Sequence, residues 1–158
     1  MSVEVQPLEC RLTIEAAPDV VWSLVRDVTR MPEWSPYLES TRLKADQVAV
    51  GARFTNLNRQ DGMDWITHGE VVELVEGERI AFRVEENWAI WSFDVSAEDG
   101  STLLVQRRET PDGLSELSRE LIEGAMGGQE AYAVASLAGM RETLQRIKAA
   151  AEGHERSE

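Results

Sequence analysis

The amino-acid sequence predicts a single α+β domain, in which one antiparallel sheet carries its helices on one face. Two observations predict this fold class. Runs of strand type follow one another between residues 38 and 110, with turn signals at short intervals. A long amphipathic helix then closes the chain. Neighbouring strands joined by tight turns pair antiparallel, so the runs are expected to form one meandering sheet of about seven strands.

The first strand is followed by helical segments. Apolar and polar residues alternate over residues 10–15, which is typical of a half-buried strand. Pro18 and Asp19 then open a helix, because proline is tolerated in a first helical turn and an acidic side chain is favourable there. Pro32 interrupts the helical pattern, and residues 33–37 form a short aromatic turn. We therefore expect two short helices after the first strand.

The remaining strands are predicted from the same alternation. Phe54 and Asn58 fall in phase on one face of their strand, and Asp61-Gly62 is a strong hairpin signal. In the run at 63–75, polar and apolar residues occur on both faces, so which face points inward stays open. The predicted strands after the helices are 38–45, 51–59, 63–75, 79–86, 88–97 and 102–110.

The C-terminal helix is predicted over residues 114–152. Leu137, Met140, Leu144 and Ile147 have the spacing of one apolar helical face. Glycine and alanine dominate residues 124–139, and interior glycines weaken a helix. Such a helix either bends or leaves space beside itself. A cavity lined by small residues and close packing of helix on sheet are equally compatible with this pattern.

Composition excludes several classes of function. The chain has 158 residues, with 29 acidic and 16 basic side chains and a net charge of −13. This balance argues against binding to nucleic acid or to an anionic membrane surface. Cys10 is the single cysteine, and no cluster of residues suggests a metal or another cofactor. There is neither a signal-peptide pattern nor an apolar run long enough for a membrane span. We expect a cytoplasmic monomer or homodimer, with one domain at 1–152 and a frayed polar tail at 153–158.

Several motifs are similar to those of a known superfamily. They are Ala17-Pro18-Asp19-Val20-Val21-Trp22, Trp34-Ser35-Pro36-Tyr37, Gly51-Ala52-Arg53-Phe54, Asn58-Arg59, Trp65, Glu70-Val71-Val72-Glu73 and Gly139-Met140-Arg141-Glu142-Thr143-Leu144. On these motifs, residues 8–150 resemble the START-like, or Bet v 1-like, helix-grip superfamily, and within it the bacterial polyketide cyclase/dehydrase and lipid-transport branch. The resemblance implies a sheet that wraps the C-terminal helix and encloses a hydrophobic cavity for a lipid, sterol, polyketide or other apolar molecule. One fold hosts many functions, so the site must decide the function.

Candidate site residues are those that would line such a cavity. Any single aromatic candidate fits a place in the core better than a role in ligand binding, and Trp34 and Tyr37 could form either a gate or a structural plug. Asn58 needs a hydrogen-bond partner, either in the protein or on a ligand. The candidate ligand-binding residues are Trp34, Tyr37, Phe54, Asn58, Trp65, Phe82, Trp91, Phe93, Arg108, Tyr132 and Met140.

Charged residues in the strands supply the remaining candidates. Arg107 and Arg108 lie on opposite faces of the last strand, so one of them points inward and needs a carboxylate such as Glu130, or an anionic ligand. His68 is the one histidine before the tail, and it is the candidate general acid–base, although its face is ambiguous.

The leading functional hypothesis is binding of a hydrophobic small molecule between the sheet and the C-terminal helix, without a cofactor. The alternative is a cofactor-independent cyclase or dehydratase that holds a polyketide-like chain in a reactive shape. An interaction module is a third interpretation, and it would require a large exposed apolar patch.

Overall fold

The computed structural model describes residues 7–60, 62–111 and 129–156, with backbone alone at 129, 130, 132 and 154–156. Its elements are β1 (Leu8–Ile14), α1 (Pro18–Val25), the 3₁₀ helix η1 (Val28–Glu33), β2 (Leu38–Leu43), β3 (Arg53–Gln60), β4 (Met63–Val75), β5 (Arg79–Val84), β6 (Ile90–Glu98), β7 (Ser101–Glu109) and α3 (Gln129–Arg156). The two short helices after β1 and the hairpin-linked strands are as predicted.

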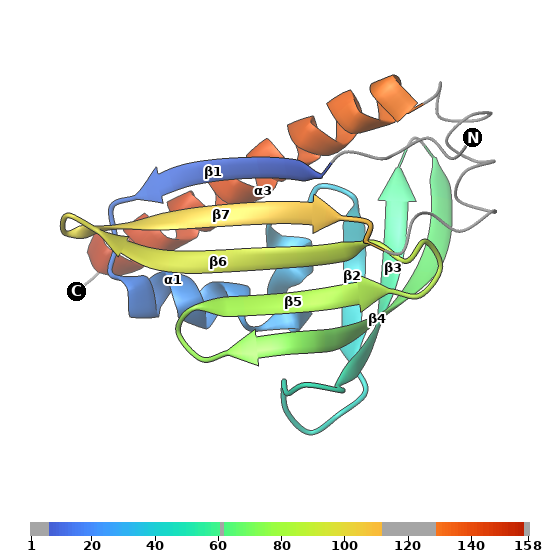
Figure 1. Ribbon diagram of the computed structural model, residues 1–158, viewed down its shortest axis with the longest axis horizontal. Helices are drawn as coiled ribbons and strands as arrows, with labels where there is room; N and C mark the ends of the chain where they lie inside the picture. Colours follow the sequence, from blue (N-terminus) through green and yellow to red (C-terminus); the bar gives the residue numbers. More distant parts are fainter. Residues whose placement is uncertain (1–6, 61, 112–128, 157–158) are drawn as a thin grey trace.

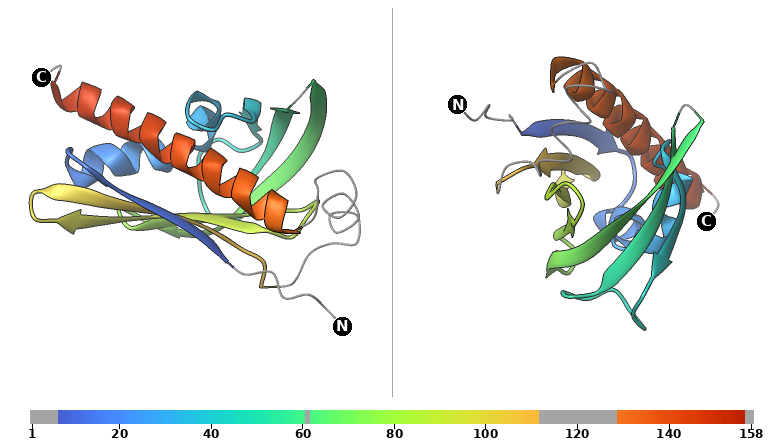
Figure 2. Two further views of the ribbon diagram at one scale, coloured as in Figure 1. Left: turned by 90° about the horizontal axis from the view of Figure 1, so that it is seen from above. Right: turned by 90° about the vertical axis from the view of Figure 1, so that its right-hand side faces the viewer.

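In the described residues, seven strands form one antiparallel sheet in the order β1-β7-β6-β5-β4-β3-β2. The first strand closes against the last, with Leu8 opposite Arg108 and Ile14 opposite Thr102. The sheet is strongly bent, so that β3 and the first part of β4 stand at a steep angle to β1, β6 and β7, and α3 crosses one face of it (Figures 1 and 2). The α+β helix-grip prediction is confirmed.

Two strands begin later than predicted because turns occupy their first residues. Gly51 has φ +92°, and the Ala52 amide donates to the Ala49 carbonyl at 2.9 Å, so β3 begins at Arg53. Trp88 has φ +65°, and its amide donates to the Val84 carbonyl at 2.8 Å, so β6 begins at Ile90. The left-handed region is rarely occupied by a residue with a side chain, and it does not continue a strand.

The α1 and η1 helices follow the local signals in the sequence. Pro18 occupies the first turn of α1, where its missing N–H costs nothing. The helix ends at Val25, and Asp27 then caps η1 by accepting from the Thr29 amide at 3.1 Å. Pro32 lies inside η1 rather than ending a single longer helix.

The C-terminal helix closes one end of the core. Met140, Leu144 and Ile147 are at most 2% exposed, which places the predicted apolar face inward. The helix packs mainly against β1 and α1, while α1 lies against β6 and β7 (Figure 2). It continues through Arg156, beyond the predicted end at 152, and the predicted stretch 114–128 lies outside the described residues. None of the described helices is long and apolar enough to cross a membrane.

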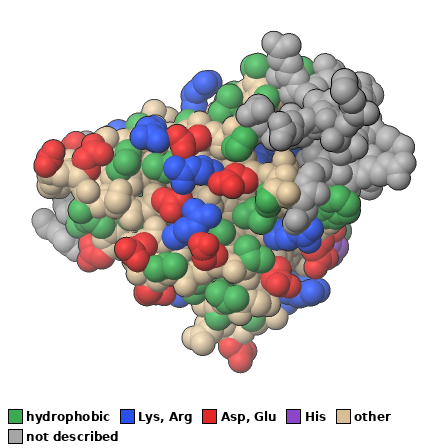
Figure 3. Space-filling model, viewed as in Figure 1, with side chains coloured by type: hydrophobic (Ala, Val, Ile, Leu, Met, Phe, Trp, Pro, Cys, Tyr) green, Lys and Arg blue, Asp and Glu red, His purple; other side chains and the backbone are tan. Residues whose placement is uncertain are grey.

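The outer face of the sheet carries a ladder of ion pairs that crosses five strands. Arg107 Nε lies 2.7 Å from Glu9 Oε1, and its Nη1 lies 3.2 Å from Asp94 Oδ2. Arg79 Nη1 lies 2.7 Å from the same Asp94 oxygen, and Arg79 Nε lies 2.6 Å from Glu73 Oε2. Basic and acidic side chains accordingly alternate across this face (Figure 3). Exposed pairs contribute little individually, but shared carboxylates make a network.

We expect ion pairs at the surface, within this network and outside it, to make stability sensitive to acid. Hydrogen bonds from Arg11 and Arg107 hold the pKa of Glu9 below its usual 4.5, and Arg30 and Arg59 do the same for the pKa values of Glu33 and Asp64. A carboxyl whose pKa is lowered on folding stabilises the fold above its unfolded pKa, and that contribution is lost as the pH falls through the folded pKa. The temperature at the midpoint of thermal unfolding should therefore decrease as the pH is lowered from about 6 to about 3.

The variant Glu9→Gln tests the assignment. Its unfolding midpoint should fall less over this pH range than that of the wild-type protein, because one of the titrating groups is gone. Asp46→Asn, at an exposed position, is the control and should keep the wild-type dependence. Equal pH dependence in Glu9→Gln and the wild type would contradict the role of Glu9.

Candidate functional site

Cross-strand register defines which side chains share the inner face of the sheet. Directly opposite residues of an antiparallel pair lie on the same face. Arg108 pairs with Trp91, and Trp91 pairs in turn with Phe82. At the other side of the sheet, Asn58 pairs with Trp65. The residues of the strands that face inward with them include Phe54, Asn56, Thr67, Gly69, Phe93 and Gln106.

One half of this inner face is a close-packed apolar core. Phe54 and Phe82 meet edge to face, with ring centroids 5.4 Å apart. Phe93 is 3% exposed, and Trp34 is 2% exposed at the end of η1. Trp34 is thus a packed core residue rather than a gate, because η1 carries it inward and Arg30 covers its ring at 5.1 Å.

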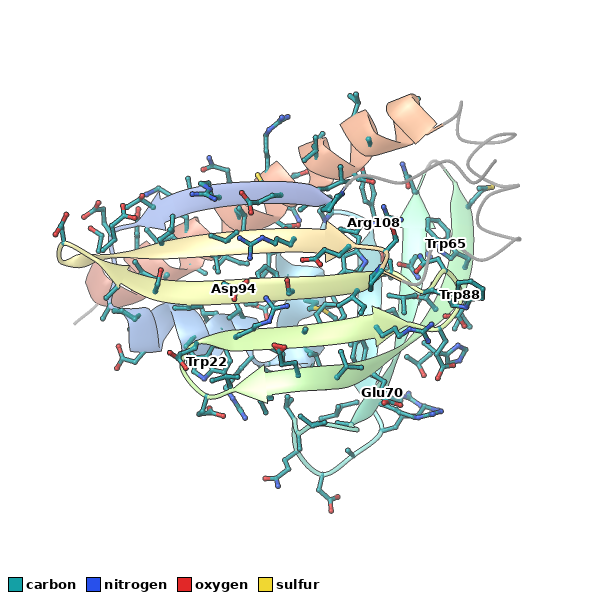
Figure 4. The ribbon with its side chains drawn as sticks, in the orientation of Figure 1. Trp22, Trp65, Glu70, Trp88, Asp94 and Arg108 are labelled. Carbon is teal, nitrogen blue, oxygen red and sulfur yellow. The ribbon has the colours of Figure 1, made fainter. Side chains whose placement is uncertain are left out.

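The other half of the inner face combines aromatic and polar side chains. Trp65 and Trp91 are partly exposed, unlike the phenylalanines of the core. Arg108 and Trp65 lie at the end of the sheet remote from Trp22 and α1 (Figure 4). Tyr37 approaches α3 here, since a Cβ on Gly139 would lie 3.0 Å from its ring. The predicted Tyr132 lies on α3, but its side chain is outside the described part of the structure.

The amides on β3 are satisfied within the protein. Asn58 Nδ2 donates to the Trp65 carbonyl at 3.1 Å and to Thr67 Oγ1 at 3.0 Å. Asn56, 6% exposed, accepts from Thr41 Oγ1 at 2.8 Å. These bonds give Asn58 an in-protein partner, one of the two possibilities that the sequence left open, and fix the polar groups in place.

Gln106 and Arg108, two residues apart on β7, bring further polar groups inward. Gln106 is 6% exposed and Arg108 is 2% exposed, whereas Arg107 points outward into the ion-pair ladder. Arg108 is therefore the inward arginine of the pair. The side chain of Glu130, its predicted carboxylate partner, is outside the described part of the structure. Sequence reasoning singled out Arg108 but missed Gln106, although the i, i+2 spacing of a strand places both on one face.

Comparison with known proteins identifies the family of this fold. The family model described as polyketide cyclase / dehydrase and lipid transport matches residues 7–152. The chain belongs to this family. No curated protein matches it at a significant level.

Solved structures with the same fold share little sequence with this family member. Ginseng major latex-like protein 151 from Panax ginseng is 18% identical, with a TM-score of 0.70, over 92% of this chain and 97% of that chain. The di-domain ARO/CYC StfQ from the steffimycin biosynthetic pathway is 16% identical, with a TM-score of 0.75, over 94% of this chain and 51% of that chain. The polyketide_cyc-like protein Cgl2372 from Corynebacterium glutamicum is 24% identical, with a TM-score of 0.61, over 90% of this chain and 88% of that chain. At such identities the likeness shows the fold alone.

The position of His68 corrects the catalytic hypothesis for this family member. Trp65, Thr67 and Gly69 occupy the inner face of β4, so the intervening His68 faces outward and is half-exposed. Its Nδ1 lies 2.6 Å from Glu86 Oε2, and its amide donates to Glu86 Oε1 at 2.6 Å. The sequence did not predict this orientation of His68, because polar and apolar residues occur on both faces of the strand at 63–75. His68 cannot act on a molecule held at the inner face.

His68 also belongs to a small group of exposed side chains that could ligate a metal. Ligating atoms of His68, Glu85 and Glu86 lie within 4.8 Å of one another. However, Glu85 also pairs with Arg53 at 3.3 Å, and Glu86 holds the histidine ring. Exposed acidic groups often gather in this way without an ion, and we assign no metal to them.

Proposed function

We propose that the protein binds an apolar small molecule between α3 and the inner face of the sheet, at the end marked by Trp65 and Trp91. The observation that carries this proposal is the composition of that end. The partly exposed Trp91 lies opposite buried Arg108, with buried Gln106 two residues along β7, and Trp65 lies at the same end of the sheet (Figure 4). Small-molecule sites are mostly apolar, with a few fixed polar groups that orient the ligand.

The packing of α3 supports the same location. The helix packs mainly against β1 and α1, and hardly at all against β4, the strand that carries Trp65. On the inward face of the helix, Leu137 is partly exposed toward the N-terminal part, whereas Leu144 and Ile147 further along are fully buried. The N-terminal half of α3 is therefore the part whose apolar surface is least covered. Burial of a ligand here would remove apolar area from water.

Binding takes precedence over catalysis because of what the interior offers. On the inner face of the described strands there is neither a histidine nor a carboxylate, and His68 faces outward. General acid–base catalysis needs such groups within hydrogen-bond reach of the substrate. Cyclase or dehydratase activity stays a prediction to which we assign no residue.

Ligand binding can be tested with two neighbouring residues on opposite faces of β4. The probe is 8-anilinonaphthalene-1-sulfonate, whose fluorescence rises in an apolar environment. Trp65→Ala should weaken its binding by about tenfold, because a large part of the contact surface is lost. Ile66→Ala, 57% exposed on the outer face, is the matched control and should leave the dissociation constant unchanged.

Equal weakening in the two variants would show that the dye binds elsewhere, and would contradict the proposed location. Native mass spectrometry of the purified protein, followed by organic extraction, would identify any molecule that the protein carries. A wild-type protein that binds neither the dye nor members of a lipid, sterol and aromatic library would refute the proposed function.

A further inference from the structure

Gln106 is a polar side chain in apolar surroundings. On the inner face it lies opposite Cys10 on β1 and Phe93 on β6, and the next inward residue of its own strand is Leu104. Leu104 and Phe93 are almost fully buried, and Gln106 itself is 6% exposed. The side chain therefore points into the interior from a strand that is paired on both sides.

The carboxamide oxygen of this side chain has an unused hydrogen-bonding capacity. Among the described residues, Gln106 Oε1 is a buried acceptor without a hydrogen-bond partner. Buried polar atoms in folded proteins nearly always have a partner, because burial without one costs the desolvation of the group. The amides of Asn56 and Asn58 obey this rule through Thr41 and Thr67. The oxygen of Gln106 requires a donor that the neighbouring strands do not supply.

Arg108 lies on the same face two residues further along β7, about 7 Å away at the rise of a strand. Arg108 is 2% exposed, and its guanidinium offers hydrogen-bond donors only. Five N–H groups give it more donors than one carboxylate partner can use, so it can hold an additional oxygen. The two side chains thus present an acceptor and a donor next to each other, with the indole of Trp91 opposite Arg108.

We propose that the ligand carries a hydroxyl group on an apolar ring, and that this hydroxyl donates to Gln106 Oε1 and accepts from Arg108. The proposal rests on the binding function above and names the chemical class of the ligand. A phenol or a ring alcohol has both capacities in one group. A pure hydrocarbon, or a molecule whose oxygens only accept, would leave the Gln106 oxygen unsatisfied.

The test uses three compounds of one shape: 2-naphthol, 2-methoxynaphthalene and naphthalene. Their dissociation constants are measured by displacement of bound 8-anilinonaphthalene-1-sulfonate. We expect 2-naphthol to bind about fivefold more tightly than 2-methoxynaphthalene, which corresponds to one neutral hydrogen bond. The methoxy compound is the more apolar of the two, so hydrophobicity alone would give the opposite order.

The variant Gln106→Met removes the amide and keeps the length of the side chain. Its preference for 2-naphthol should disappear while naphthalene binding is retained. Because the change also removes an unsatisfied buried oxygen, the variant should unfold at the same or a higher temperature than the wild type. A clear loss of stability would show that the protein itself satisfies Gln106, and would overturn the inference.

The outcomes separate the two proposals. If none of the three compounds binds the wild-type protein, the proposed function fails. If all three bind equally, or if the preference for 2-naphthol persists in Gln106→Met, the binding function stands and the hydroxyl assignment is overturned. Loss of the preference in a stable Gln106→Met protein supports both.

Discussion

Gly69→Ala should destabilise the protein by about 1–3 kcal/mol, although it adds only one methyl group. A Cβ at this position would lie 2.3 Å from Phe54 Cζ and 2.5 Å from Phe54 Cε2. The ring has little room to withdraw, because Phe54 is 1% exposed and meets Phe82 edge to face. Either the ring leaves its rotamer or β3 and β4 separate. Denaturant unfolding of the variant measures the loss.

Two further variants make this result specific. Gly153→Ala makes the same change on α3, where nothing lies within 4 Å of the new Cβ, and it should be neutral or stabilising by up to about 1 kcal/mol. Combining Gly69→Ala with Phe54→Leu removes the colliding atoms. The double variant should lose less stability than the sum of the single changes, as contacting residues do. Strict additivity would show that the collision is not the cause.

Ile147→Ala should cost about 2–5 kcal/mol, the largest single loss that we expect from α3. The side chain is completely buried and belongs to the same core as Val21 and Val25 of α1 and Leu104 of β7. Truncation to alanine removes the apolar side-chain atoms that Ile147 contributes to this core and leaves a cavity there. Chemical denaturation followed by circular dichroism gives the change in unfolding free energy.

Gln145→Ala is the control for Ile147→Ala on the same helix. Gln145 is exposed, so its truncation should change the unfolding free energy by no more than about 0.5 kcal/mol. Both changes raise helix propensity, so a comparable loss in the two variants would contradict burial of Ile147 as the cause. A small loss at Ile147 would mean that α3 docks weakly on the rest of the fold.

Much of the architecture could be predicted because several segments show an unambiguous pattern of apolar and turn residues. Ile80, Phe82 and Val84 share one face of the strand, with the two arginines of the strand on the other face, and all three are buried in β5. Phe54 and Asn58 share the inner face as their spacing indicates. The turn at Gly77 has φ +80°, which glycine adopts without strain. Local chemistry and tertiary structure agree at these positions.

The site was less predictable because its placement depends on tertiary pairing. His68 lies in a strand with polar residues on both faces, and only the pairing with β3 and β5 decides its side. A register irregularity between Val71 and Glu73 then changes the phase of the same strand, which no pattern in the residues signals. The position of Trp34, in the core rather than at a cavity entrance, was also set by η1, a helix too short to show periodicity. The strand spacing placed Gln106 on the face of Arg108, but its unpaired carboxamide oxygen became visible only in the structure.

The pairing of β1 with β7 has a consequence for the order of folding. Leu8 and Arg108 are direct partners, yet a hundred residues separate them along the chain. Contacts of such long range form late and slow the folding of a domain. During synthesis at about 5–20 residues per second, β1 would wait for roughly 5–20 seconds before its partner strand exists. Throughout that interval β1 lacks the strand with which it pairs, so the nascent chain is exposed to wrong pairing at this strand.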